Sequence, residues 1–286
     1  GVDAAILYKD IMSPMVAIGV NVDIKPGVGP VFDTPIRRME DIERLYAFDA
    51  TKVEYISKTI ELLTTEVLDV PLIGFCGAPF TIASYLIEGG PTKSYNKTRG
   101  MLISEPEIWN RLMEKLADMS IEYLSMQARA GANALQIFDS WVGAVNSTEY
   151  GQAIFPHMKR IISTVKSRFP NLPLAMNGVG TDHLVSTWAK LPLDVIALDW
   201  RSSLGAAKDR GVTQTVQGNL DPAYLYGDTK IIAKVVDEIL TDGVRHGKHV
   251  FNLGHGVFPE ADPAKLHWLT DFVHEKSREL WARESR

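Results

Sequence analysis

The sequence predicts an α/β barrel of the (β/α)8 type, and three observations lead to this fold class. Seven short, almost continuously apolar segments recur along the 286 residues, and a helical pattern follows each of them. Such segments are typical of strands that are covered on both faces, as in parallel sheets. The joins are short, and no G-x-G-x-x-G motif of the dinucleotide-binding fold follows any strand. We therefore expect one barrel domain that spans residues 1–286.

The seven predicted strands are about five residues long. They cover residues 4–8, 70–75, 134–138, 172–176, 195–198, 213–216 and 249–253. A closed barrel of this type needs eight strands. Because the chain enters its first apolar segment directly after Gly1, we expect that the first strand of the barrel is the one absent from the sequence.

Capping signals predict the helices between these strands. Ser104-Glu105-Pro106-Glu107 has the spacing of a capping box with proline in the first turn. The positions that follow keep one apolar face up to Gly131, namely Ile108, Leu112, Leu116, Met119 and Tyr123. Asp262-Pro263 starts the last helix, and residues 228–240 form another that Gly243 closes.

One region, residues 20–32, breaks the alternation of strands and helices. It reads as a small β-hairpin with its turn at Pro26-Gly27. We expect this hairpin to be an insertion in the barrel.

Composition limits the classes of function. Thirty basic against thirty-five acidic side chains give a net charge of −5, which disfavours a general binder of nucleic acid or of anionic membranes. No apolar run approaches the roughly 18 residues of a transmembrane helix, and no signal peptide opens the sequence. The single cysteine, Cys76, excludes an internal disulfide and a multi-cysteine metal site. We expect a cytoplasmic protein.

Polar residues follow the C-terminal ends of the predicted strands, where such barrels place their chemistry. Asp139 and Asp199 stand at two of these ends, but aspartates there more often cap helices or brace loops than catalyse. Three asparagines at strand ends suit turns equally well, namely Asn177, Asn219 and Asn252. Ser140 has no histidine beside it, which counts against a serine nucleophile.

Three further strand-end residues point to a ligand. His255 is the only one of the seven histidines at a strand end, and two glycines flank it, which favours a ligand role. Lys9 and Asp10 are adjacent, so strand alternation directs one side chain inward and the other outward. An inward lysine would suit a Schiff-base aldolase, whereas an inward aspartate would suit a positive or N–H-bearing centre.

The segment Gly74-Phe-Cys-Gly-Ala-Pro-Phe-Thr-Ile-Ala-Ser-Tyr-Leu-Ile-Glu-Gly-Gly90 closely resembles a signature segment of the uroporphyrinogen decarboxylase family. Ile82 stands where leucine or valine is more usual. The resemblance extends, in order, over essentially the whole chain: Tyr8-Lys-Asp-Ile11, Gln136-Ile-Phe-Asp-Ser140, Leu198-Asp-Trp200, Gln217-Gly-Asn-Leu-Asp-Pro222 and Asn252-Leu-Gly-His-Gly256.

The resemblance implies a (β/α)8 barrel that needs no cofactor or metal and is usually a homodimer. It would remove the four acetate carboxyls of uroporphyrinogen III to give coproporphyrinogen III in haem biosynthesis. By matching position, Asp10 resembles the aspartate that faces the pyrrole nitrogens, and Tyr85, Ser140 and His255 resemble the substrate-contacting tyrosine, serine and histidine. The family's first strand carries an Arg-Gln-Ala-Gly-Arg segment without a counterpart here, so we expect the absent strand to supply carboxylate-binding arginines.

The implied chemistry suits these residues. Loss of CO2 from a pyrrole acetate leaves an electron pair, and protonation of the pyrrole ring provides a sink for it. A fixed Asp10 carboxylate would stabilise the cationic ring where its charge develops. The substrate carries eight carboxylates, and Lys93, Lys97, Arg99 and Arg201 are the cations available near the strand ends.

Two alternatives remain open at this point. A related corrinoid-linked methyltransferase would activate a thiol at zinc, but that metal needs histidine and cysteine ligands, and the sequence has only Cys76 and no His-x-Cys. A tetrapyrrole-binding barrel without activity would follow if the arginine segment were truly absent.

Overall fold

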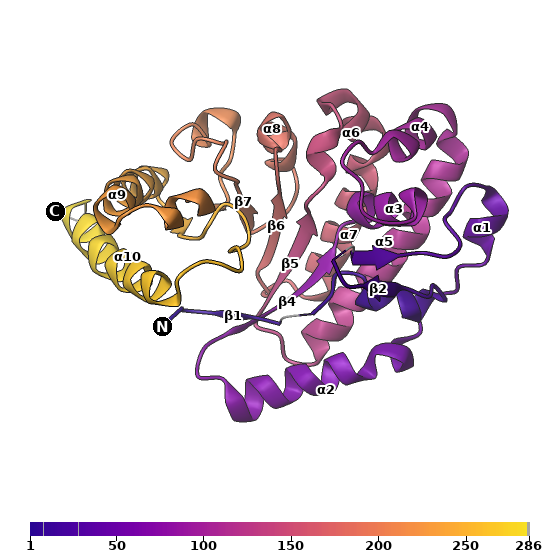
Figure 1. Cartoon of the computed structure of the whole chain (residues 1–286), viewed down its shortest axis with the longest axis horizontal. Coiled ribbons are helices and arrows are strands. Elements are labelled where there is room, and N and C mark those ends of the chain that lie inside the picture. Colours follow the sequence, from indigo (N-terminus) through magenta and orange to yellow (C-terminus); the bar gives the residue numbers. More distant parts are fainter. Residues whose placement is uncertain (8, 28, 285–286) are drawn as a thin grey trace. The chain divides into compact units, whose positions relative to one another are not determined.

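A computed structural model describes residues 1–7, 9–27 and 29–284 and shows an α/β fold (Figure 1). The chain divides into two compact units. The N-terminal unit comprises residues 4–174, and the C-terminal unit comprises residues 175–286 together with residues 1–3. Tyr8, the last residue of the first predicted strand, and Val28 of the predicted hairpin lie outside the described residues.

Three strands of the N-terminal unit form a parallel sheet in chain order. β1 (Ala5–Ile6) pairs with β4 (Leu72–Gly77), and β4 pairs with β5 (Ala134–Asp139). The predicted hairpin is present as the antiparallel pair β2 (Asp23–Lys25) and β3 (Gly29–Val31).

The C-terminal unit adds four parallel strands, again in chain order. β6 (Leu174–Gly178) pairs with β7 (Val195–Ala197), β7 with β8 (Thr215–Gln217), and β8 with β9 (His249–Val250). Every predicted strand is therefore present, all seven are parallel, and the α/β fold class is confirmed.

The starts of three strands, β4, β6 and β8, differ from the prediction by two residues. β4 and β6 begin directly after Pro71 and Pro173, respectively, because proline has no N–H with which to join the ladder. The carbonyls of both prolines still accept, from Ala5 N at 2.9 Å and from Leu135 N at 2.9 Å.

Helices fill the connections of the N-terminal unit. Its α-helices are α1 (Met39–Glu43), α2 (Glu54–Leu62), α3 (Pro79–Glu88), α4 (Asn96–Ser104), α5 (Pro106–Arg129), α6 (Ser147–Ala153) and α7 (Phe155–Arg168). Short 3-10 turns are η1 (Ser13–Ile18), η2 (Ala50–Val53) and η4 (Val142–Ala144), and α2 continues into a π-helical turn, η3 (Leu63–Val67).

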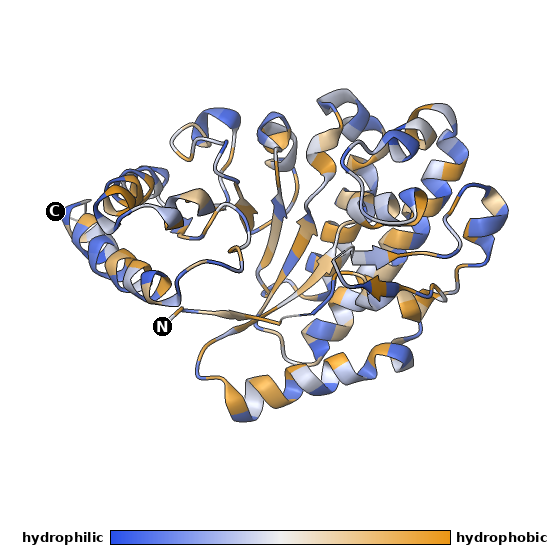
Figure 2. Cartoon of the chain, viewed as in Figure 1, coloured by the Kyte–Doolittle hydropathy of each residue, from blue (hydrophilic) through white to orange (hydrophobic). Residues whose placement is uncertain are grey.

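The predicted capping box at Ser104 is wrong. Ser104 is the last residue of α4, so its backbone is still helical, and Glu105 takes the N-cap position of α5 without a side-chain bond. The predicted apolar face is present: Leu112, Leu116 and Tyr123 are completely buried. Hydrophobic residues are concentrated on β4, β5 and one face of α5 (Figure 2).

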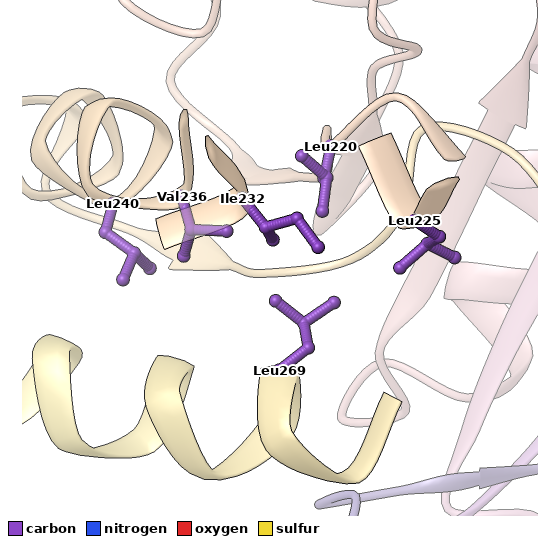
Figure 3. Packing of buried hydrophobic residues seen from close by; sticks show 6 residues of the cluster. All are labelled: Leu220, Leu225, Ile232, Val236, Leu240 and Leu269. Carbon is purple, nitrogen blue, oxygen red and sulfur yellow. The ribbon is translucent and has the colours of Figure 1, made fainter. Parts of the chain in front are cut away.

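The C-terminal unit contains two long helices, α9 (Thr229–His246) and α10 (Pro263–Glu284). Shorter elements are α8 (Val185–Trp188), η5 (Asp182–Leu184), η6 (Lys208–Arg210) and η7 (Pro222–Tyr226). Leu269 of α10 packs against an apolar cluster whose other members are Leu220, Leu225, Ile232, Val236 and Leu240 (Figure 3). The Asp262 carboxylate caps α10 by accepting from Ala264 N at 2.9 Å.

The predicted end of α9 at Gly243 is also wrong. The helix continues to His246 and ends at Gly247, whose φ of 91° is the left-handed conformation that favours glycine. Gly243 is needed for a different reason: a Cβ there would lie 2.2 Å from His249 Nδ1 of β9. Within the described residues, no helix combines the length and apolar character that crossing a membrane requires.

Candidate active site

Asp10 lies between β1 and η1, where its backbone and side chain together start the 3-10 turn. Its Oδ1 accepts from Met12 N at 2.7 Å, and its carbonyl accepts from Ser13 N at 3.1 Å and from Ser13 Oγ at 2.7 Å. Within the described residues, the carboxylate is thus fixed through Oδ1.

Lys9 and Asp10 lie against different helices. Lys9 Nζ donates to Phe75 O at 3.1 Å and sits 4.5 Å from the ring centroid of Tyr123 on α5. Burial lowers the pKa of Lys9 to about 7. Asp10 instead is close enough to Tyr85 of α3 for its negative charge to contribute to the raised pKa of that phenol. Lys9 therefore lies against α5, and the Asp10 carboxylate is the charge that acts on Tyr85.

The edge of β4 explains why the chain leaves the sheet before Asp10. Ile73 O, on this edge, accepts from Leu7 N at 3.0 Å, but the next groups along the edge are taken by a side chain. Gln127 of α5, completely buried, accepts from Phe75 N at 3.0 Å and donates to Phe75 O at 2.9 Å. The amide of Gln127 thus occupies the place where β1 would otherwise continue.

Tyr85 belongs to an aromatic cluster above the strand ends. Its ring centroid is 4.0 Å from that of Trp141, which in turn lies 5.2 Å from the ring of Tyr95. Burial, with smaller effects from Asp10 and Tyr95, raises the pKa of Tyr85 to about 12, so the phenol stays protonated and can donate a hydrogen bond. Ser140 directly precedes Trp141, which places it beside this cluster.

Asp139 is completely buried next to Ser140. Thr81 Oγ1 donates to its Oδ1 at 2.8 Å and accepts from Trp141 N at 3.2 Å, so Thr81 ties α3 to the end of β5. Asp139 Oδ2 has no hydrogen-bond partner among the described residues, and burial raises the pKa of this carboxyl to about 7. These contacts fit the interpretation of Asp139 as a brace.

Several signature residues have structural roles that the sequence did not reveal. Pro79 occupies the first turn of α3, and Gly89 ends that helix with a φ of 87°. Glu88 Oε1 accepts from Lys97 N and Thr98 N, both at 3.0 Å, and so caps α4. The signature segment thus fixes α3, which carries Tyr85, and the start of α4, which follows the next loop.

In the C-terminal unit, His255 lies exposed in the loop after β9. Its Nδ1 accepts from Gly256 N at 2.6 Å, so the neutral imidazole carries its proton on Nε2. The outer nitrogen is therefore a donor without further protonation, as carboxylate binding requires. The ring lies nearly parallel to that of Trp200, with centroids 6.4 Å apart.

The other polar strand ends of this unit brace loops. Asp199 accepts from Gly180 N at 2.5 Å and from Arg201 N at 3.0 Å. Asn219 donates to the carbonyls of Asp199 and Ser202, and Asn252 Oδ1 accepts from Leu253 N at 2.8 Å. Asp10, Tyr85 and Ser140 thus belong to one unit and His255 to the other, and their convergence on one ligand stays a prediction.

A groove of about 490 Å³ in the N-terminal unit is not part of this candidate site. Tyr46, Phe48 and charged side chains of α5 and α7 line it, whereas Asp10, Tyr85 and Ser140 do not. Its charges pair with one another, Arg168 with Glu122 at 2.7 Å and Arg160 with Asp118, which is the pattern of a helix–helix contact.

Comparisons with known proteins complete the description. The family model described as uroporphyrinogen decarboxylase (URO-D) matches residues 1–276. A uroporphyrinogen decarboxylase of Geobacillus sp. (strain WCH70) is 56% identical over 96% of this chain and 79% of its own length. That of Bacillus subtilis (strain 168) is 55% identical over 97% of this chain and 78% of its own length.

Solved structures share the fold at low identity. A methyltransferase from Methanosarcina mazei has a TM-score of 0.78 at 17% identity, covering 96% of this chain and 80% of that one. A B12-independent methionine synthase from Shewanella sp. W3-18-1 has a TM-score of 0.59 at 14% identity, covering 79% and 68%. At these identities the likeness is one of fold.

Proposed function

The chain belongs to the uroporphyrinogen decarboxylase family, a carboxy-lyase of haem biosynthesis, and on this premise we propose a role for each residue of the candidate site. The observation that carries the function is the match over residues 1–276, with more than half of the residues identical to the Geobacillus and Bacillus enzymes. The substrate we propose is uroporphyrinogen III, and the product coproporphyrinogen III.

Asp10 is the catalytic residue of this proposal. Protonation of a pyrrole ring makes it an acceptor for the electron pair released with CO2, so no cofactor is needed to hold these electrons. The Asp10 carboxylate accepts hydrogen bonds from the pyrrole N–H groups and stabilises the ring cation. Its support is the Met12 N–H bond, which fixes the carboxylate before substrate binds and so avoids reorganisation during the reaction.

Tyr85, Ser140 and His255 bind the substrate side chains. Tyr85 is a protonated donor near the Asp10 charge, and Ser140 lies beside the Tyr85–Trp141 pair. His255 presents Nε2–H, which suits a carboxylate. The direct test is anaerobic incubation of the purified protein with uroporphyrinogen III, with products separated by carboxyl number. Absence of products with fewer carboxyls would refute the assignment.

We also propose that the protein is a cytoplasmic homodimer, as the family resemblance implies. An exposed apolar patch in the C-terminal unit supports a second copy as the partner. Tyr226 is 70% exposed and Val257 50% exposed, and the Tyr226 ring stacks on Phe258 with centroids 4.3 Å apart. Isolated apolar residues are ordinary on a surface, but a pair of stacked aromatic rings, here from η7 and from the loop after β9, is typical of an interface.

Substitution Tyr226→Asp is expected to weaken this dimer. A carboxylate placed in an apolar contact loses its hydration without gaining a partner, so the dissociation constant should rise at least about 10-fold. Light scattering after size exclusion, over a range of concentrations, measures it. Tyr55→Asp on α2, where the tyrosine is 58% exposed, is the control and should leave the mass unchanged. Equal masses for the wild type and Tyr226→Asp at every concentration would exclude this patch as the interface.

A further inference from the structure

Arg201 of the C-terminal unit has a half-exposed side chain that is bound to a buried carboxylate. It follows β7, and its Nη1 donates to Asp199 Oδ2 at 2.7 Å. Asp199 is completely buried, whereas the Arg201 side chain is 49% exposed. The buried carboxylate therefore holds the guanidinium at the surface. This bond uses one of the five N–H donors of the guanidinium.

Asp199 does not depend on Arg201 alone for its partners. Its Oδ1 accepts from Arg201 N at 3.0 Å, and its Oδ2 also accepts from Gly180 N at 2.5 Å. Backbone N–H groups thus satisfy much of the buried carboxylate. The guanidinium is oriented by this contact and still has donors directed to solvent.

Trp200 connects Arg201 to His255. The Arg201 Cζ lies 4.0 Å from the Trp200 ring centroid, and the His255 ring lies nearly parallel to the same indole. Gly254 makes this approach possible, because a Cβ at that position would lie 2.6 Å from Trp200 N. A fixed cation and a fixed Nε2–H donor are therefore held on one rigid aromatic side chain.

We propose that Arg201 binds a carboxylate of the porphyrinogen side chains, as a substrate-binding residue beside His255. The proposal rests on the proposed role of His255 at the substrate. The planar fork of arginine suits a carboxylate, and a guanidinium held by Asp199 and Trp200 loses little side-chain entropy when the ligand arrives. The other cations near the strand ends are less suitable. Arg99 pairs with Glu149 at 3.3 Å, Lys93 and Lys97 are exposed, and none of the three lies over an aromatic ring of the described residues as Arg201 does.

The test compares Arg201→Met with Arg245→Met in the full-length protein. Arg245 is another exposed arginine of the same unit, paired with Asp242 at 3.3 Å and placed on α9. Binding of the oxidised ligand uroporphyrin I, followed by fluorescence, should weaken about 10- to 100-fold in Arg201→Met and remain within about 2-fold in Arg245→Met. For turnover of uroporphyrinogen, KM should rise while kcat stays within about 3-fold.

A lysine variant separates charge from structure. Arg201→Lys keeps the cation but loses the fork, so its affinity for uroporphyrin I should fall between those of the wild type and Arg201→Met. The binding assay needs no turnover, so it tests Arg201 even if the wild type proved inactive on uroporphyrinogen. Unchanged affinity in Arg201→Met would overturn the proposal. Equal losses in the lysine and methionine variants, or a fall in kcat with an unchanged KM, would also overturn it.

Discussion

Asp10→Asn is expected to lower the turnover of uroporphyrinogen by roughly 10²- to 10³-fold, the range for removal of one preorganised electrostatic contact. The amide oxygen can still accept from Met12 N, so the backbone of η1 should keep its conformation. The negative charge is lost, however, and an N–H donor replaces the second oxygen and opposes the pyrrole N–H groups. Because the ring cation is most developed in the transition state, the loss should fall mainly on kcat.

The measurement is anaerobic turnover by the full-length protein, with products resolved by carboxyl number. Asp10→Glu keeps the charge but moves it by about one methylene, so it should impair binding as well as turnover. Asp23→Asn in the exposed hairpin is the matched control and should retain activity within about 2-fold. An Asp10→Asn enzyme within a few-fold of the wild type would mean that the ring charge is stabilised elsewhere.

Asp139→Asn is expected to change the pH dependence of stability. Burial raises the pKa of this carboxyl from its ordinary value of 3.8 to about 7 in the folded state. Between about pH 4 and pH 7 the folded protein therefore keeps a proton that the unfolded chain releases. The contribution of Asp139 to the free energy of unfolding should fall with rising pH across this window, by roughly 1 kcal/mol per pH unit, and the change should end above about pH 7.

The asparagine variant lacks this titration. At pH 8 it should be more stable, relative to the wild type, than at pH 5 by a few kcal/mol, with the Thr81 hydroxyl still able to donate to the amide oxygen. Urea unfolding of both proteins at a series of pH values measures the difference. Thr81→Val removes the bond that favours the charged form, so it should move the upper end of the window to higher pH. A stability difference independent of pH would show that Asp139 is charged in the folded protein at pH 5.

β4, β5 and β6 were predictable because burial on both faces leaves a continuous apolar run. β1 and β9 were predictable from the same apolar pattern, although Ile6 and Val250 are exposed. The first residues of β4 and β6 were not predictable. Pro71 and Pro173 lack the N–H that a ladder position requires, and which positions belong to the ladder is known only once the neighbouring strand is in place. The ends of α5 and α9 depended on neighbours in the same way. Ser104 cannot cap a helix while α4 still includes it, and Gly243 is needed by His249 rather than by the helix terminus.

The candidate site, too, was predictable only in part from the sequence. Asp10, Tyr85, Ser140 and His255 could be identified because their motifs resemble those of a known family. The orientation of Lys9 and Asp10 could not, because strand alternation allows either assignment. The contacts of Lys9 Nζ with Phe75 O and with the ring of Tyr123 decide it, because they place the lysine against α5. Arg201 could be named only as one of four cations near the strand ends, and its contacts with Asp199 and Trp200 single it out.

The buried amide of Gln127 also makes this segment intolerant of a change in length. A side chain at Gly74 would lie 2.8 Å from Gln127 Oε1, so the amide packs directly against the backbone of β4. Insertion or deletion of one residue between Leu7 and Asp10 could not be absorbed by sliding β1 along β4. An insertion before Lys9 would bring the lysine to the position of the carboxylate, and a deletion there would bring Ile11 to that position. The surrounding loops can accept new lengths, whereas this short stretch permits substitutions only.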